Sequence, residues 1–201
     1  MEKVNVAVLV SGGGTNLQAL IDAQNRGEMP HCELKLVVSN VKDAYALTRA
    51  QNNGIPSCTV IKKKGGQEDF ENEIVSALEE NGIELIVLAG FLSILSKSFT
   101  DRYKNRIINV HPSLIPSFCG KGYYGLKVHE AALAYGVKVT GATVHYVNEV
   151  PDGGQIILQK AVEIEDGDTP ETLQRRVMEQ AEWVLLPRAT ELAAEKIIEE
   201  R

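Results

Sequence analysis

The stretch Val4-Asn5-Val6-Ala7-Val8-Leu9-Val10, continued by Ser11-Gly12-Gly13-Gly14-Thr15-Asn16, decides the fold. Its first seven residues are almost all apolar, as in a strand that is covered on both faces. The glycine run leads into residues 17–21, which have helical character. A strand, a glycine turn and a helix in this order present free backbone N–H groups and a helix N-terminus to a phosphate. The stretch therefore predicts an α/β fold with a phosphate site at the glycine turn, where Thr15 and Asn16 add side-chain donors.

The glycine run also narrows the class of ligand. Gly12 and Gly14 fit the first positions of G-x-G-x-x-G, but Leu17 stands at the third glycine. The run lacks the Lys-Ser/Thr pair of a nucleoside-triphosphate loop. A single phosphate is the favoured ligand, and a glycine turn without any ligand is the plainer alternative.

Further apolar runs alternate with helical stripes along the first half of the chain. We expect strands at 34–38, 57–61, 85–89 and around 107–108, with helices at 43–53, capped by Asp43, and at 68–81. This alternation predicts a single doubly wound, mostly parallel sheet with helices on both faces. No linker or repeat divides the chain, so we expect one domain over residues 1–201.

The second half of the chain predicts an antiparallel C-terminal addition to the sheet. The β-rich runs 140–147 and 155–164 are joined by a loop that ends in Asp152-Gly153-Gly154. A short helix is expected at 128–135. Thr169-Pro170-Glu171 starts a further helix that passes Glu182 and is interrupted or kinked at Pro187.

Composition excludes several classes of function. The net charge of -6 argues against a nucleic-acid or membrane-surface binder, because phosphate contacts need clustered Lys and Arg. Three dispersed cysteines give neither a disulfide framework nor a zinc knuckle, which fits a cytoplasmic protein. No apolar run approaches the roughly 20 residues that span a bilayer, no secretory signal is evident, and no cluster of metal ligands stands out.

Asn109-Val110-His111-Pro112 places an amide and an imidazole at the end of an expected strand. Residues i and i+2 of a strand point to the same face, so Asn109 and His111 can reach one cavity. One group can bind a developing oxyanion while the other moves a proton. The plainer reading is a capping Asn109 and a hydrogen-bonded core His111. The carboxyl ends of parallel strands share one edge, so this pair and the glycine turn are expected in one crevice.

Five motifs of the chain together resemble the phosphoribosylglycinamide formyltransferases of purine synthesis. They are Ser11-Gly-Gly-Gly-Thr-Asn16, Leu88-Ala-Gly-Phe91, Asn109-Val-His-Pro-Ser-Leu-Ile-Pro116, Gly141-Ala-Thr-Val-His145 and Asp152-Gly-Gly154. The match covers nearly the whole chain, and the motifs keep their order and approximate spacing. Each motif is weak alone, but the combination is highly specific.

The resemblance implies transfer of a formyl group from 10-formyltetrahydrofolate to the amino group of glycinamide ribonucleotide, without a metal. It implies that Asn109 binds the oxyanion, that His111 transfers the proton and that Asp152 orients His111. Other implied roles fall into three sets: the ribonucleotide contacts Gly14, Thr15, Asn16 and Glu182; the folate contacts Leu92, Ser93, Ile94, Leu95, Asn109, Val147, Asn148 and Asp152; and the supporting His145. The expected protein is a monomer or homodimer that binds these two small molecules and neither nucleic acid nor membrane.

Four other functions fit the sequence less well than this formyl transfer. A methionyl-tRNA formyltransferase would need a further RNA-binding domain and a basic surface. A formyltetrahydrofolate hydrolase usually carries an extra N-terminal domain, whereas the formyltransferase motifs here start close to Met1. A non-catalytic folate or nucleotide sensor does not require Asn109, His111 and Asp152 together. A dinucleotide-dependent oxidoreductase is disfavoured by Leu17.

Overall fold

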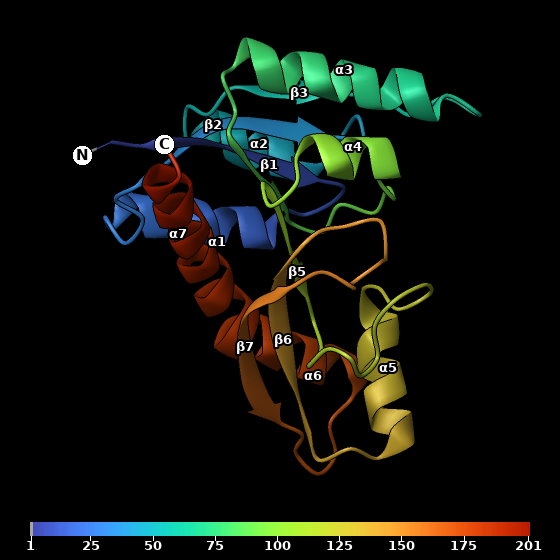
Figure 1. Cartoon of the computed structure of the whole chain (residues 1–201). Coiled ribbons are helices and arrows are strands. Elements are labelled where there is room, and N and C mark those ends of the chain that lie inside the picture. Colours follow the sequence, from blue (N-terminus) through green and yellow to red (C-terminus); the bar gives the residue numbers. More distant parts are fainter. Residues whose placement is uncertain (1) are drawn as a thin grey trace.

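The computed structural model describes residues 2–201 and contains one seven-stranded sheet (Figure 1). Its strands, in the spatial order β3-β2-β1-β4-β5-β6-β7, are β3 Ser57–Thr59, β2 Cys32–Ser39, β1 Val4–Val10, β4 Leu85–Leu88, β5 Ile107–His111, β6 Val139–Tyr146 and β7 Ile156–Glu163. Strands β1 to β5 pair in parallel, while β6 pairs antiparallel with both β5 and β7. The predicted mostly parallel sheet with an antiparallel C-terminal addition is confirmed.

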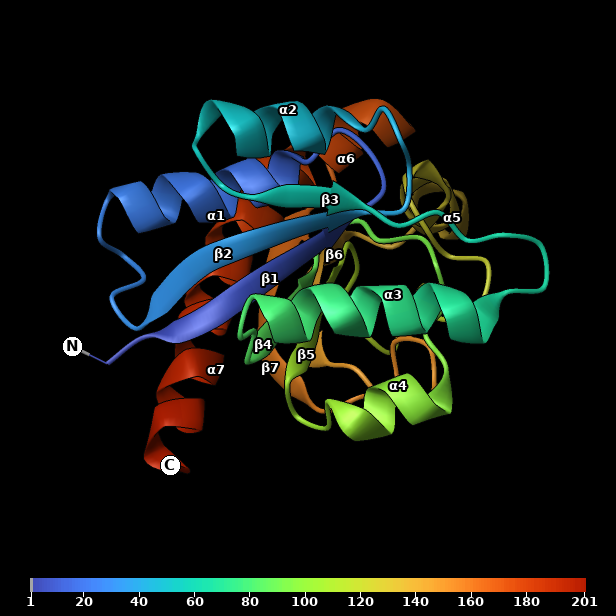
Figure 2. The same ribbon diagram turned by 90° about the horizontal axis from the view of Figure 1, so that it is seen from above.

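Helices cover both faces of the sheet, as predicted, and Figure 2 shows α1 and α2 on one side of β1 and β2 with α3 on the other. The helical elements are α1 Thr15–Asn25, α2 Tyr45–Asn52, α3 Gln67–Glu80, α4 Lys97–Arg102, α5 Leu126–Tyr135, α6 Pro170–Val177, the π-helix η1 Met178–Glu182 and α7 Trp183–Glu199. Leu17 and Leu20 of α1 are fully buried on one face, and Phe70 and Ile74 of α3 lie buried on the other. Burial of each such side chain contributes roughly 1.5–3 kcal/mol. No helix within residues 2–201 is both long enough and apolar enough to cross a membrane.

The expected capping of α2 by Asp43 is wrong. The helix begins at Tyr45, and Ala44 at its N-cap makes no side-chain hydrogen bond. The Ala46 N–H, one of the free donors of the first turn, donates instead to the Gly12 carbonyl over 3.1 Å. The glycine turn therefore supplies the partner that a capping side chain would have given, and it fixes α2 beside α1.

The C-terminal helix departs from α geometry earlier than expected. Thr169 caps α6 in a reciprocal pair with Thr172, and Pro170 follows it, which confirms the predicted helix start. The irregular stretch is the π-helix at residues 178–182, whereas Pro187 lies inside α7. Trp183, four residues before this proline, has ψ -13°, which turns its carbonyl out of the regular helix. The sequence predicted the irregularity of the helix at Pro187. In the structure it lies about one turn before that proline.

Candidate active site

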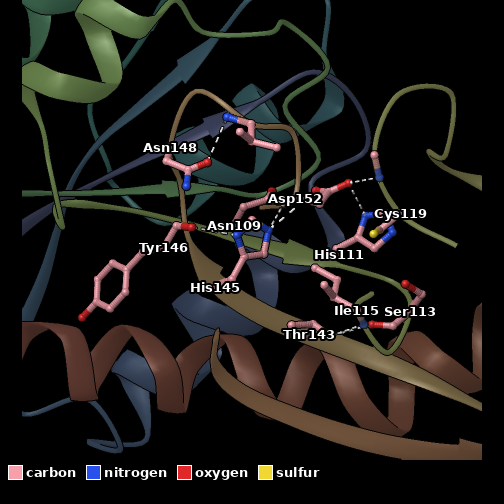
Figure 3. Close-up of polar contacts among 12 residues, drawn as sticks. Asn109, His111, Ser113, Ile115, Cys119, Thr143, His145, Tyr146, Asn148 and Asp152 are labelled. Atoms are coloured by element: carbon pink, nitrogen blue, oxygen red, sulfur yellow. Dashed lines mark hydrogen bonds and ion pairs between the residues drawn. The ribbon is translucent and has the colours of Figure 1, made fainter. Parts of the chain in front are cut away.

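The end of β5 brings Asn109 and His111 to the same face, against the antiparallel strand β6 (Figure 3). Asn109 stands opposite His145, and His111 stands opposite Thr143. Asp152 reaches this face from the loop between β6 and β7. Its Oδ2 lies 3.6 Å from His111 Nδ1, and its Oδ1 lies 3.6 Å from His145 Nε2. The amide, the imidazole and the carboxylate that the sequence singled out therefore lie together, and His145 lies with them.

Asp152 is held at the site by its backbone and by one strong hydrogen bond. Its φ of 56° lies in the left-handed region, which Asp tolerates better than most residues. The Gly120 N–H donates to Oδ2 over 2.8 Å. Burial acts to raise the pKa of Asp152, but the contact with His145, the charge of His111 and the Gly120 N–H together lower that pKa below its ordinary value. The carboxylate is therefore negatively charged at neutral pH.

The hydrogen bonds of His145 define how Asn109 is oriented. His145 Nδ1 donates to the Tyr146 carbonyl over 2.8 Å. When the ring is neutral, its Nε2 atom is then an acceptor, and Asn109 Nδ2 lies 3.2 Å from it. One Asn109 N–H is used in this contact and the second is free to bind an oxyanion. His145, expected to have a supporting role, thus contacts Asn109 and lies 3.6 Å from Asp152 Oδ1, too far for a good hydrogen bond.

His111 is buried, and its two ring nitrogens have different partners. Nε2 lies 2.9 Å from the Phe118 carbonyl, which can only accept, so this nitrogen carries a hydrogen. Nδ1 faces Asp152 at a distance too long for a good hydrogen bond. Nδ1 is therefore the ring nitrogen that can take up or give a proton.

The glycine turn forms a second polar group of residues. Gly14 has φ 71° and stands at the N-cap of α1, so the N–H groups of Thr15 and Asn16 belong to the free first turn of that helix. Asn16 Nδ2 donates over 2.7 Å to Glu182 Oε2 from η1, and both side chains are buried. Burial raises the pKa of Glu182, and the hydrogen bond from Asn16 opposes this rise. Asn16 and Glu182, far apart in sequence, are thus brought together by the fold.

The loop after β4 presents the apolar residues expected at a flat ligand. The Leu92 and Ile94 side chains are 65% and 68% exposed, which is unusual for residues of their size, whereas Leu95 is buried in the core beneath α3. Two bonds from neighbouring strand ends hold the loop. The Leu92 N–H donates to Ser11 Oγ over 2.9 Å, and Asn40 Nδ2 donates to Ser93 Oγ over 2.8 Å.

On the opposite side of β5, Val147 packs against the same core as Leu95, and Asn148 is exposed in the loop before Asp152. Its Oδ1 accepts the Val150 N–H and so shapes that loop.

One group of possible metal ligands occurs among residues 2–201, and it is elsewhere in the molecule. His31, Glu191 and Glu195 lie together where α7 meets the start of β2, and His31 Nδ1 is 2.6 Å from Glu191 Oε1. These contacts hold α7 against the segment that precedes β2. The expectation of a reaction without a metal stays a prediction.

Comparison with known proteins identifies the family. Residues 4–190 match the model of the formyl transferase family. The chain is also 40% identical over 183 residues to a phosphoribosylglycinamide formyltransferase of Haemophilus influenzae, covering 90% of this chain and 83% of the relative. The chain belongs to the phosphoribosylglycinamide formyltransferase family.

Members of this family occur alone or within longer proteins. The chain is 45% identical over 193 residues to the trifunctional purine biosynthetic protein adenosine-3 of Gallus gallus, covering 96% of this chain but only 18% of that protein. Among solved structures, glycinamide ribonucleotide transformylase 1 from Symbiobacterium toebii superimposes with a TM-score of 0.89 at 37% identity. The superposition covers 96% of this chain and 89% of the Symbiobacterium toebii chain.

The structure also shows contacts at the site from residues that the sequence did not single out. Arg49 donates from Nε to the Gly13 carbonyl over 2.8 Å and places a cation beside the glycine turn. The Phe118 carbonyl and the Gly120 N–H contact His111 and Asp152 directly. Backbone groups leave no residue-type signal, and Arg49 lies within an ordinary helix, so sequence patterns could not have revealed them.

Proposed function

We propose that the chain transfers a formyl group from 10-formyltetrahydrofolate to the amino group of N1-(5-phospho-D-ribosyl)glycinamide. The products are the N-formyl ribonucleotide and tetrahydrofolate, and the step belongs to purine (IMP) synthesis. The observation that carries the proposal is the grouping of Asn109, His111 and Asp152 at the end of β5. Family membership supports the same reaction.

The reaction needs charge stabilisation and one proton transfer. The amine nitrogen bonds to the formyl carbon, and the carbonyl oxygen becomes an oxyanion. When this intermediate collapses, the bond between that carbon and the folate nitrogen breaks. The amine nitrogen loses one proton and the folate nitrogen gains one, so no net proton is required. The free N–H of Asn109 suits the oxyanion, because a fixed donor stabilises charge that develops in the transition state.

His111 is the group that carries the proton in this proposal. Its Nε2 is engaged by Phe118, and its Nδ1 is free to exchange a proton with the reacting nitrogens. The charged Asp152 stabilises the imidazolium that forms when Nδ1 is protonated. Asp152 therefore assists without accepting the proton itself.

Two further regions bind the substrates. The N–H groups of Thr15 and Asn16, after Gly14, suit the ribonucleotide phosphate at a helix N-terminus. Glu182 suits the substrate amine, since a buried carboxylate with one neutral partner can accept from an ammonium group. Leu92, Ser93 and Ile94, with Leu95 as their buried anchor, form one wall of the folate site. The other wall is made by residues 147–152 and Asn109.

The decisive experiment measures tetrahydrofolate release with and without glycinamide ribonucleotide, in buffer treated with a chelator. Release that depends on the amine, accompanied by the N-formyl product, is expected. Release without the amine would identify a formyltetrahydrofolate hydrolase, and binding of both ligands without release would identify a sensor. A His111→Ala variant, matched by a Tm measurement, separates loss of chemistry from loss of folding.

We further place this activity in the cytoplasm, with the chain acting as a monomer or homodimer and without nucleic acid or membrane as partner. Three free cysteines support a reducing compartment. Size-exclusion chromatography with light scattering gives the oligomeric state directly, and a larger assembly would contradict this part of the proposal.

A further inference from the structure

Thr143 is completely buried on β6, directly opposite His111 in the ladder of β5 and β6. Its hydroxyl has its full complement of three hydrogen bonds. Oγ1 donates to the Ser113 carbonyl over 2.7 Å and accepts from the Ile115 N–H over 3.1 Å. Gln159 Nε2 of β7 donates to the same oxygen over 2.9 Å. One hydroxyl therefore holds the first half of the turn that follows His111, at Ser113 and at Ile115 (Figure 3).

This turn leads to the carbonyl that engages His111. Ser113, held by Thr143, donates from its own hydroxyl to the Ser117 carbonyl over 2.6 Å. The residue after Ser117, Phe118, has φ 48°, a left-handed conformation that is unfavourable for a bulky side chain. Such a conformation persists only where surrounding contacts fix it. The bonds that start at Thr143 supply this constraint. They end at the Ser117 carbonyl, one residue before Phe118, whose own carbonyl lies 2.9 Å from His111 Nε2.

We propose that Thr143 is a positioning residue for His111: its hydroxyl fixes the 113–118 turn, so that the Phe118 carbonyl keeps a hydrogen on Nε2 and leaves Nδ1 as the nitrogen that exchanges protons. The catalytic part of this inference rests on the proposed function. The structural part, the placement of the hydrogen on the ring, does not.

A change of tautomer would prevent His111 from taking up a proton at Nδ1. If the turn relaxes and the Phe118 carbonyl withdraws, Nε2 loses its acceptor. The neutral ring can then carry its hydrogen on Nδ1, where the Asp152 carboxylate accepts it. In that form the only lone pair lies on Nε2, which points away from Asp152, and Nδ1 cannot take up a proton.

The test compares Thr143→Val with Thr143→Ser. Valine keeps the shape of the side chain and removes the hydroxyl, whereas serine keeps the hydroxyl and removes one methyl group. The ¹⁵N chemical shifts of His111 are recorded on the protein without substrates, at a pH where the ring is neutral. The parent protein and Thr143→Ser should show the hydrogen on Nε2, and Thr143→Val should show a mixture or the Nδ1 form.

Steady-state kinetics provide the second readout. Misplacement of a catalytic group by a remote change can reduce the rate by about 10–100-fold, and kcat of Thr143→Val should fall in this range. KM for both substrates should stay within about twofold, because neither is held by Thr143. Thr143→Ser should restore kcat to within about threefold of the parent value.

The outcomes separate the two claims. A Thr143→Val protein that retains the Nε2 hydrogen and the parent kcat overturns the inference. If that variant does not fold, Ser113→Ala decides, since it keeps the Thr143 hydroxyl and removes the next bond of the same series, from Ser113 Oγ to the Ser117 carbonyl. An unchanged His111 signal in Ser113→Ala then refutes the inference, and a mixed signal supports it. If the parent protein transfers no formyl group, the proposed function fails while the nitrogen shifts still report on the positioning role.

Discussion

Replacement of Gly14 by alanine tests the glycine turn at its most constrained point. Gly14 has φ +71°, and a Cβ atom added there would lie 2.7 Å from Ala46 Cβ and 2.9 Å from Ala46 Cα. Ala46 is completely buried on α2 and bonded through its N–H to Gly12, so it has little room to move away. The substitution therefore imposes both a backbone strain and a collision between α2 and the start of α1.

The expected loss of stability follows from these two effects. A left-handed conformation costs a residue with a Cβ about 1–2 kcal/mol. Overpacking of a well-packed contact typically costs about 1–3 kcal/mol. Together they predict a loss of about 2–5 kcal/mol, which for a chain of this size lowers Tm by roughly 4–20 °C. Because the first turn of α1 must shift, KM for the ribonucleotide should rise more than KM for the folate.

The same turn provides two matched controls. A Cβ atom added at Gly12 or Gly13 would meet nothing within 4 Å, and neither residue has a positive φ. Gly12→Ala and Gly13→Ala should therefore leave Tm almost unchanged. Thermal unfolding by circular dichroism and steady-state kinetics on all three variants complete the test. If Gly14→Ala is no less stable than Gly13→Ala, the assigned conformation of this turn is wrong.

Three more predictions concern single side chains. Asp152→Asn should lower kcat by ~10²–10⁴-fold with little change in Tm, and an unchanged rate and pH profile would exclude the role given to the carboxylate. Ile94→Ser should raise KM for the folate, with a loss of less than about 0.5 kcal/mol in stability because the side chain is 68% exposed; an unaltered KM would remove it from the folate site. Asp168 is held by the Arg176 guanidinium, which together with the Glu165 N–H and the Thr172 hydroxyl lowers its pKa from 3.8 to about 2. A lowered pKa in the folded protein stabilises it above the unfolded pKa and loses that effect as pH falls through the folded value. Asp168→Asn should therefore lower the free energy of unfolding by about 1 kcal/mol at neutral pH. Urea unfolding should show this difference from the parent disappearing between pH 3.8 and about 2. A difference that persists at the acid end of this range would contradict the assignment.

The fold could be predicted from the sequence because its elements carry local signals. The apolar run of β1, the glycine turn and the cap of α6 at Thr169 each specify a conformation through nearby residues alone. The error at Asp43 arose where a tertiary contact, from Ala46 to Gly12, replaced the local cap. The short helix α4 was not predicted, since six residues carry too little periodicity.

The candidate site could be predicted only as far as side-chain types allow. Asn109 and His111 share a face by strand periodicity, whereas Asp152 was associated with them only through the family resemblance. The loop that carries Asp152 has no periodicity from which its path could be derived, and its left-handed backbone is a property of the fold. The bond between Asn16 and Glu182 joins residues 166 positions apart, a distance at which sequence patterns give no contact information.

Asn109 Nδ2 and Asp152 Oδ1 lie 3.2 Å and 3.6 Å from the same nitrogen of His145, so the three side chains pack as a single cooperative unit. Loss of any one member disturbs the orientation of the other two, so the free-energy cost of the first substitution already includes part of the second. In a double-mutant cycle, Asn109→Ala combined with Asp152→Ala should therefore slow the reaction by much less than the product of the two separate factors. If the free-energy effects of the two substitutions simply add in the double variant, Asn109 and Asp152 act independently.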